Sequence, residues 1–323
     1  MIILISYALM ITAYLGGSYY YYNTANSQHF FDPYYQVSPP KFKVPYIKEA
    51  NEYRIIAIGG STTRDPRKKE EENYPFLLQQ LLQAKFPDKK ITVLNGGMNW
   101  YCSKHSLMFY TEYAQLFHPD LVLVMDGIND VYRSFSPRDF AIGEFQPDYR
   151  HFYGASIHGA APVSLEHSIF HAGQEDLTDY KKTKFPFSDF LAFNSFRQFE
   201  TSLTGYIQAD GAKCMLIMQP SIYQSTISDS VEKVLWFGKS LCNRNSNGQK
   251  TYPDAASMKT AMDSFVIAVK TISFQQNCLL LNADSGIPKT LSYFNDDVHY
   301  TSTGDSLLAQ LVFNKIISAG IIR

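Results

Sequence analysis

A serine in a glycine turn and a histidine with a nearby aspartate supply the parts of a nucleophilic catalyst. Ser61 follows two glycines at the end of the apolar run 54–58 and precedes a helical pattern, so a tight turn can expose its hydroxyl. A serine hydroxyl is inert until a base takes its proton, and His299 is the candidate base. Asp296 precedes His299 in a D-x-x-H arrangement and can turn back to orient the imidazole. We predict Ser61 as nucleophile, His299 as base and Asp296 as its partner.

Acyl transfer also needs hydrogen-bond donors for the negative oxygen of its tetrahedral intermediate. Two further segments that follow apolar runs can supply them, residues 95–97 (NGG) and 126–130 (DGIND). The backbone N–H of Gly97 and the side-chain amide of Asn129, together with the N–H of Ser61, would form an oxyanion hole. Alternatively, Asn129 caps the segment after it and Gly97 supplies a positive φ.

Other polar residues near these motifs have simpler interpretations. A Gly-Gly-Ser turn is also typical of structural and phosphate-binding loops, but this one lacks the Gly-Lys-Ser/Thr ending of a P-loop. Asp130 and Asp297 are interpreted as turn or local hydrogen-bonding residues, and the charged run 67–72 as a solvated loop. His167 and His171 have the i, i+4 spacing of zinc ligands, yet no Glu or Cys accompanies them in a recognised spacing. We predict neither a metal nor a cofactor.

Short apolar runs alternate with helical patterns from residue 54 onward. The expected strands are 54–58, 91–94, 121–125, 214–218 and 278–281, and the expected helices are 74–86, 103–117, 196–209, 255–274 and 303–318. This alternation is typical of an α/β protein with a parallel sheet covered on both faces, in which ligands bind at the carboxyl ends of the strands. Segments 131–192 and 221–254 interrupt the pattern and are expected to be lids or substrate-binding insertions.

Composition excludes some classes of function. The 323-residue chain is 45% hydrophobic and 18% charged, with a formal net charge of -1. It lacks the cationic excess that nucleic-acid binding usually needs. Its 4 cysteines do not make a disulfide scaffold or a zinc-type motif. The continuous alternation of elements favours one catalytic domain over residues 51–323.

The N-terminus has the composition of a membrane-directed segment. Residues 1–15 contain no charge, and four tyrosines follow at 19–22 as a possible interfacial belt. The run approaches the ~20 residues that span a bilayer. We predict a transmembrane anchor or signal segment over 1–22 and a proline-punctuated stalk over 23–50. No Lys or Arg precedes Lys41, unlike the basic start of a signal peptide, and a buried N-terminal helix is the alternative.

The four motifs together resemble those of the SGNH, or GDSL-type, hydrolase superfamily. From about Tyr53 to the C-terminus, residues 59–61, 95–97, 127–130 and 296–299 match its four blocks in order. The resemblance implies a flavodoxin-like three-layer α/β/α sheet of about five parallel strands. It also implies the roles of Ser61, His299, Asp296, Gly97 and Asn129 given above. The family's usual Asp before the serine is Gly60 here, which we expect to affect substrate preference more than activity.

These observations predict a serine esterase. The expected reaction is hydrolysis of an O-acyl, in particular an O-acetyl, ester through an acyl-serine intermediate. The N-terminal segment and the GGSTT turn look like those of bacterial envelope members of the superfamily that act on glycans, so the expected substrate is a cell-envelope or extracellular glycan. The domain is then expected outside the cytoplasm, in the periplasm or the extracellular space. A glycan O-acyltransferase with the same residues and an inactive glycan-binding domain are the alternatives.

Overall fold

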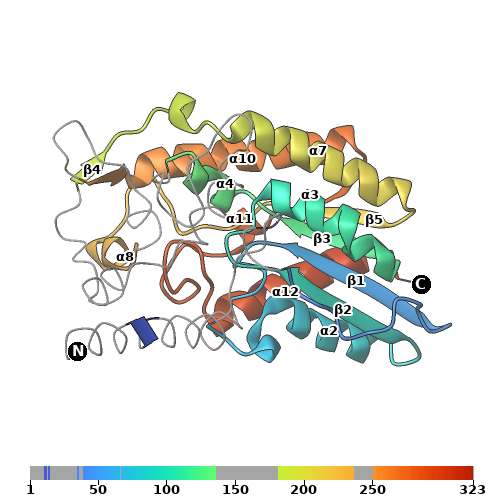
Figure 1. Ribbon diagram of the computed structural model, residues 1–323. Helices are drawn as coiled ribbons and strands as arrows, with labels where there is room; N and C mark the ends of the chain where they lie inside the picture. Colours follow the sequence, from blue (N-terminus) through green and yellow to red (C-terminus); the bar gives the residue numbers. More distant parts are fainter. Residues whose placement is uncertain are drawn as a thin grey trace, which may run out of the picture.

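The computed structural model describes residues 11, 12, 14, 35, 39–65, 67–135, 181–235 and 250–322. At its centre is a five-stranded sheet in the order β2-β1-β3-β5-β7, in which every strand pair is parallel (Figure 1). The strands are β1 (Glu52–Gly59), β2 (Lys90–Gly97), β3 (Leu121–Met125), β5 (Lys213–Ile217) and β7 (Leu279–Leu281). All five predicted strands lie in this sheet, so the predicted parallel α/β fold is confirmed.

Helices cover both faces of the sheet (Figure 1). On one face α2 (Tyr74–Lys85) packs against α12 (Ser302–Ser318), and on the other lie α3 (Ser103–Glu112), α7 (Phe193–Ala209) and α10 (Ala255–Gln275). The shorter helices are α4 (Ile128–Arg133), α8 (Asp229–Val234) and α11 (Ala283–Gly286), with 3₁₀ turns η3 (Glu70–Glu72), η4 (Ala114–Phe117) and η6 (Phe187–Asp189). The result is the three-layer α/β/α arrangement.

The central position of β1 follows from its sequence. The side chains from Ile55 to Ile58 are completely buried, and Ile56 lies opposite Leu94 of β2 and Val122 of β3. A strand with helices on both faces has no solvated side, so it needs a continuous apolar run rather than an alternating one. The apolar run therefore directs this segment to the middle of the sheet.

The order of the strands reverses between β1 and β3. The chain leaves β1 through α2 to reach β2 at the edge, and it then returns through α3 to β3 on the other side of β1. In open α/β sheets, ligands bind at such a switch point, beyond the carboxyl ends of the strands. Ser61 follows β1 and Asn129 follows β3. Both predicted site residues therefore lie at the switch point.

The predicted helix 103–117 is divided in two. α3 ends at Glu112, and Tyr113 leaves the helical conformation with a φ of -138° before the 3₁₀ turn η4. This turn carries Phe117 against Phe42, with ring centroids 5.0 Å apart and the rings close to perpendicular. Phe117 is 1% exposed, and burial of its ring offsets the break in helical hydrogen bonding.

The described part of the predicted stalk, residues 39–50, packs onto the domain. Arg54 in β1 is 1% exposed, and its Nη1 donates to the carbonyl oxygens of Pro45 and Tyr46 at 2.9 and 3.0 Å. Its Nε lies 2.8 Å from a carboxylate oxygen of Glu52. A buried cation thus joins this segment to the first strand of the sheet.

The segments predicted as insertions, 131–192 and 221–254, begin after β3 and after β5, and each contains one short strand. β4 (Lys181–Thr183) and β6 (Thr251–Pro253) pair in parallel with each other. The remaining parts, residues 136–180 and 236–249, lie outside the described residues. The predicted membrane segment 1–22 lies outside them too, except for residues 11, 12 and 14. Within the part of the chain that the structure describes, no helix is long and apolar enough to cross a bilayer.

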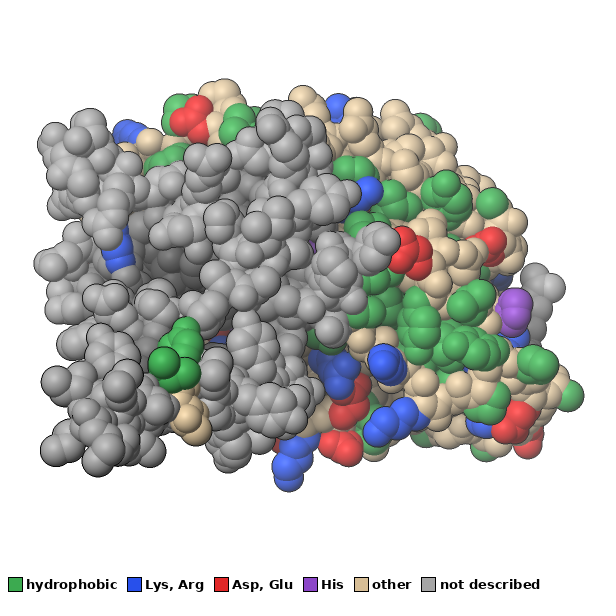
Figure 2. All heavy atoms as spheres, in the orientation of Figure 1, with side chains coloured by type: hydrophobic (Ala, Val, Ile, Leu, Met, Phe, Trp, Pro, Cys, Tyr) green, Lys and Arg blue, Asp and Glu red, His purple; other side chains and the backbone are tan. Residues whose placement is uncertain are grey.

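Charged side chains of both signs share the described surface. In the view of Figure 2, Lys and Arg side chains lie beside Asp and Glu side chains along the lower part of the described surface. Some surface charges pair, as Lys259 of α10 does with Asp263 at 2.7 Å. Exposed pairs of this kind contribute little to stability. Interspersed charges fit the net charge of -1 and do not create the basic field that attracts a polynucleotide.

Replacing Arg54 tests the role of the buried cation. We expect Arg54→Ala to lower the free energy of unfolding by about 3 kcal/mol, because it leaves the buried Glu52 carboxylate without its charged partner. Urea denaturation followed by circular dichroism measures this change. Arg197→Ala, at an exposed position of α7, is the control and should change stability by less than about 0.5 kcal/mol. Equal effects of the two changes would contradict this interpretation.

Candidate active site

Residues 59–63 form a turn that carries the predicted nucleophile Ser61, here named the nucleophile turn. It is packed tightly against the end of β3. A Cβ atom on Gly59 would lie 2.5 Å from the carbonyl oxygen of Met125 and 2.5 Å from Oγ1 of Thr63. The turn closes where the N–H of Thr63 donates to the carbonyl of Gly60 at 3.0 Å. Only glycine allows this approach at position 59, and the turn then presents Ser61 at the carboxyl edge of the sheet.

Ser61, His299 and Asp296 form a hydrogen-bonded triad. Oγ of Ser61 lies 2.8 Å from Nε2 of His299, and Nδ1 of His299 lies 3.0 Å from each carboxylate oxygen of Asp296. His299 is 3% exposed and Asp296 is 6% exposed. When Nδ1 carries the proton, Nε2 is free to accept the serine hydroxyl proton. The structure therefore brings together the three residues predicted as nucleophile, base and partner.

The loop before α12 holds the triad carboxylate. Oδ1 of Asp296 accepts the backbone N–H groups of Val298 at 3.0 Å and of His299 at 2.8 Å. Burial favours the neutral carboxyl, but hydrogen bonds from the His299 imidazole and these N–H groups outweigh it and lower the pKa of Asp296 to about 2. Asp296 is therefore ionised at neutral pH and can stabilise an imidazolium.

Asn129 lies directly beside the nucleophile turn. Its Nδ2 donates to the carbonyl oxygen of Tyr101 at 2.8 Å, and a Cβ atom on Gly60 would lie 2.5 Å from the same Nδ2. An amide nitrogen has two N–H donors, so the second is available for another acceptor. The glycine that replaces the family's Asp therefore has a structural reason: any side chain at position 60 would displace Asn129.

Gly97 packs against the other side of the turn. A Cβ atom on it would lie 2.8 Å from the backbone nitrogen of Arg64 and 2.8 Å from Cβ of Thr63. Its own N–H donates to Oδ1 of Asn95 at 3.0 Å. To donate to an oxyanion, this N–H would have to leave Asn95 or form a bifurcated hydrogen bond to both acceptors. The close packing explains why a glycine stands here, while its role as a donor remains a prediction.

Gln219 connects the nucleophile turn to residues 126–129, which follow β3 and are here named the Asn129 turn. Its Nε2 donates to Oγ1 of Thr62 at 2.7 Å, and its Oε1 accepts the N–H of Ile128 at 2.7 Å. The side chain is buried at 2% exposure. Gln219 was not predicted as a site residue, because its only signal in the sequence is a polar side chain directly after the apolar strand 214–218.

Asp297, predicted as a turn or local hydrogen-bonding residue, bonds to side chains that are distant in the sequence. It is fully buried, and its Oδ2 accepts the hydroxyl groups of Tyr132 at 3.1 Å and Tyr223 at 3.0 Å. These tyrosines follow β3 and β5. The loop that carries His299 is thus tied to the ends of two strands. Because the two tyrosines belong to distant segments, spacing along the chain could not reveal this arrangement.

The charged run 67–72 is also more than a solvated loop. Nη1 of Arg67 lies 3.0 Å from Oδ2 of the triad residue Asp296, and Nζ of Lys68 lies 2.5 Å from Oδ2 of Asp305 in α12. Both Asp296 and Asp305 are buried. The first two residues of the run therefore contact the site or its supporting helix. The prediction of a solvated loop is wrong for Lys68, whose side chain is 10% exposed, whereas Arg67 is solvated on one side and bonded to Asp296 on the other.

Three buried carboxyl groups lie behind the Asn129 turn. Asp130 accepts the hydroxyl of Ser103 at 2.6 Å and its N–H at 3.1 Å, which anchors the start of α3. Burial raises the pKa of Asp130 to about 6. Burial, and then the charge of Asp130, raises the pKa of Asp126 to about 7, and burial also raises that of Glu200. Asp130, predicted as a turn or local hydrogen-bonding residue, is therefore part of a buried acidic group.

Metal ligation has no support among the described residues. No group of three or more His, Cys, Asp or Glu side chains in that part of the chain is placed to hold an ion. The zinc-like pair His167 and His171 lies outside the described residues.

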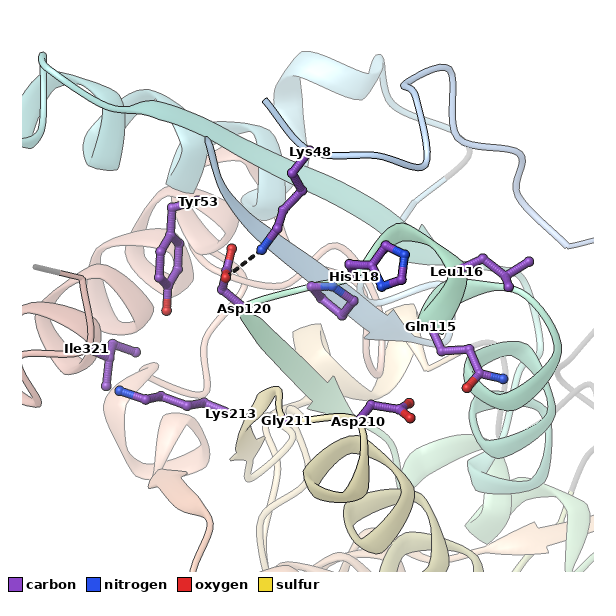
Figure 3. Close-up of a pocket in the computed structure, with 11 residues that line it drawn as sticks. Lys48, Tyr53, Gln115, Leu116, His118, Asp120, Asp210, Gly211, Lys213 and Ile321 are labelled. Atoms are coloured by element: carbon purple, nitrogen blue, oxygen red, sulfur yellow. Dashed lines mark hydrogen bonds and ion pairs between the residues drawn. The ribbon is translucent and has the colours of Figure 1, made fainter. Parts of the chain in front are cut away.

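A separate cleft of about 550 Å³ lies at the opposite edge of the sheet (Figure 3). It is lined by residues that precede the strands, among them Asp120 before β3 and Lys213 at the start of β5. Lys48 crosses it and pairs with Asp120 at 2.6 Å. Since the triad lies at the carboxyl ends of the strands, this cleft is not part of the site.

Comparison with solved structures places this geometry in a known fold. The acetylxylan esterase Axe2 from Geobacillus stearothermophilus is 17% identical, with a TM-score of 0.50 over 82% of this chain and 94% of that chain. A mutant of Axe2, named an acetyl-xylooligosaccharide esterase, is 18% identical with the same TM-score and coverage. LAE5, an alpha/beta hydrolase enzyme from the metagenome of Lake Arreo, is 15% identical, with a TM-score of 0.50 over 86% of this chain and 99% of that chain.

The chain has the SGNH hydrolase fold. The sheet, its flanking helices and the order of the four motifs agree with the resemblance found in the sequence. No family model matches the chain, and no curated protein matches it in sequence. The likeness therefore rests on the structure and on the motifs.

Gly60→Ala tests the contact between the nucleophile turn and Asn129. The added methyl group would lie 2.5 Å from Nδ2 of Asn129, so we expect the amide to move and kcat for p-nitrophenyl acetate to fall about 100-fold. Gly205→Ala is the matched control, because a Cβ atom there meets nothing within 4 Å, and it should leave kcat unchanged. Unchanged kcat in Gly60→Ala, with a native circular dichroism spectrum, would disprove the assigned contact.

Asp126→Asn tests the buried acidic group. The pKa of Asp126 is raised from 3.8 to about 7, so its contribution to stability is complete below the unfolded value and is lost as pH rises through 7. Between pH 5 and pH 8, we expect the wild type to lose about 2 kcal/mol of unfolding free energy relative to the variant. Urea denaturation at both pH values measures this difference. Asp88→Asn, at an exposed position, is the control and should follow the wild type at both values.

Proposed function

We propose that this protein is a serine esterase that hydrolyses O-acetyl esters on a glycan. The observation that carries the proposal is the 2.8 Å contact between Oγ of Ser61 and Nε2 of His299, whose other ring nitrogen is held by an ionised Asp296. This is the arrangement that activates a serine for acyl transfer. Solved structures with the same fold include Axe2, an acetylxylan esterase, and this supports an O-acetylated glycan as the substrate class.

The triad performs the proposed reaction in two halves. His299 takes the proton of Ser61 as Oγ attacks the ester carbonyl carbon, and the resulting imidazolium is stabilised by the Asp296 carboxylate. The tetrahedral intermediate collapses as the sugar oxygen leaves and receives that proton from His299. Water then attacks the acyl-serine, His299 accepts its proton, and collapse releases the acid and returns the proton to Ser61.

Donors beside Ser61 support the charge of the tetrahedral intermediate. The second N–H of the Asn129 amide and the backbone N–H of Ser61 are proposed to bind the negative oxygen, with the Gly97 N–H as the third donor. Gln219 holds the two turns that carry Asn129 and Ser61 at a constant separation. Donors that are already in place cost no reorganisation when charge develops, which is why such sites lower the barrier.

The proposed location is the cell envelope. The first 15 residues are free of charge and precede four tyrosines at 19–22, the pattern of a segment that enters a bilayer. We infer that this segment anchors the protein with its catalytic domain in the periplasm or the extracellular space. An acetylated envelope or extracellular glycan would be accessible there.

Ser61→Ala tests the proposed function. We expect the variant to lose at least 1,000-fold in kcat for acetate release from p-nitrophenyl acetate and from acetylated xylo-oligosaccharides, because the acyl-serine cannot form. Ser264→Ala, at a half-buried serine whose hydroxyl donates to the carbonyl of Thr260 within α10, is the control and should retain full activity. In addition, a fluorophosphonate probe should label Ser61 in the wild type, as located by mass spectrometry.

Two results would contradict this proposal. Equal turnover by wild type and Ser61→Ala would exclude Ser61 as the nucleophile. Transfer of the acetyl group to an unacetylated glycan acceptor, with little free acetate, would identify an acyltransferase instead, since the same triad serves both reactions. Both outcomes are measured by quantifying acetate with and without the acceptor.

A further inference from the structure

A charged chain extends beyond the triad through Arg67. Its guanidinium contacts two carboxylates, with Nε and Nη2 at 2.9 and 2.8 Å from Asp65 and Nη1 at 3.0 Å from Oδ2 of Asp296. The Asp65 and Asp296 side chains are only 6% and 8% exposed, whereas that of Arg67 is 51% exposed. The cation therefore lies between two buried anions, one of which is the partner of the catalytic base.

We propose that Asp65 and Arg67 act as a pair of positioning residues that hold the Asp296 carboxylate and set the electrostatic field at His299. This inference rests on the proposed esterase function. Neither residue contacts the reacting atoms in this arrangement. They act through Asp296, which bonds to both Arg67 and the imidazole.

The geometry gives Arg67 a defined orientation. Its two contacts with Asp65 form a bidentate pair, which constrains a guanidinium more than a single bond does. Asp65 is itself held, because its N–H donates to Oδ1 of Asn73 at 2.8 Å. The remaining nitrogen then points at Oδ2 of Asp296. A lone exposed arginine would contribute little, but this one is fixed by a buried carboxylate.

The negative charge of Asp65 balances the positive charge that Arg67 places beside Asp296. A cation beside Asp296 alone would cancel the negative charge that stabilises the imidazolium of His299 during catalysis. Asp65 restores that charge, since the three groups together carry the net charge of one carboxylate. Burial opposes ionisation of Asp65, but hydrogen bonding to Arg67 and then the charge of His299 lower its pKa. Asp65 is thus close enough to the imidazole to influence it.

The other charged and titratable groups around the triad would stay in place in the test variants. Among the described residues these are Lys68 and its partner Asp305, the buried Asp297, and the Tyr132 and Tyr223 hydroxyls that donate to it. Lys68 and Asp305 form a closed pair, and Asp297 is held on the loop that carries His299. Each substitution at position 65 or 67 therefore removes one charge near His299 and leaves these other groups unchanged.

Single substitutions should shift the titration of His299 in opposite directions. Arg67→Gln removes a positive charge, so the imidazolium is favoured and the imidazole should titrate at a pH higher than in the wild type by about 0.5 unit or more. Asp65→Asn leaves the cation beside Asp296, so titration should move to lower pH by a similar amount. The double variant should return close to the wild type. Arg67→Lys keeps the positive charge but cannot form the bidentate contact with Asp65. It should leave the titration midpoint of the imidazole unchanged and lower kcat.

Two measurements on the full chain read these shifts. The acid limb of the pH profile of kcat/KM for p-nitrophenyl acetate should move with the base. NMR of histidine-labelled protein follows the His299 imidazole directly, with its signal assigned through His299→Gln. Arg64→Gln removes a positive charge from the same loop, where Arg64 faces Glu70 at 3.3 Å, and is the matched control that should leave the midpoint in place.

Shifts in the same direction for Arg67→Gln and Asp65→Asn, or no shift in either, would overturn the inference. A purely structural role predicts loss of activity without opposite movements of the titration. The NMR titration does not depend on turnover. If the wild type showed no Ser61-dependent hydrolysis, the proposed function would fail while the titration still decided the roles of Asp65 and Arg67. If one variant failed to fold, the opposite shift expected of the other would still be measurable.

Discussion

The hydrogen bond between Oγ of Ser61 and Nε2 of His299 joins residues 238 positions apart in the chain, and its 2.8 Å length depends on the whole sheet. Ser61 is placed by β1, the strand that pairs on both sides, and His299 by the loop before α12. Gln219 holds the first turn and Asp297 the second. Both supporting side chains are buried, so the bonds that align the triad are made in a medium where an unsatisfied polar group is costly.

Close packing at the strand ends explains the departure from the family motif. Gly60 leaves room for the Asn129 amide, which occupies the space that a side chain at position 60 would need. On the other side, Gly97 allows the turn to approach β2 to within van der Waals contact. Gly60 and Gly97 therefore let the turn that carries Ser61 pack closely on two sides, against Asn129 and against the end of β2. An added methyl group at either position would displace a neighbour, because the interior is closely packed.

Environment, rather than residue type, decides which carboxyl groups of the site are charged. Asp296 and Asp126 are both buried, yet the pKa of Asp296 is about 2 and that of Asp126 about 7. Asp296 receives hydrogen bonds from an imidazole and from two backbone N–H groups, whereas Asp126 lies near the negative charge of Asp130. The same chemical group is thereby fully ionised beside the His299 imidazole, whereas in the core burial and then the charge of Asp130 leave it only about half ionised near neutral pH.

Sequence alone determined the parallel α/β fold and pointed to Ser61, His299 and Asp296, the three residues that form the hydrogen-bonded triad, because apolar periodicity and strand-end motifs are local properties of the chain. The fit of Gly60 to Asn129 and the roles of Gln219, Asp297 and Arg67 were decided only by the tertiary structure. Their partners lie at other strand ends or in the loop before α12, at separations along the chain that no spacing rule describes. The turn at Ser61 is visible in the sequence as five consecutive residues. The contacts that keep Ser61 aligned with His299 come from packing across the sheet.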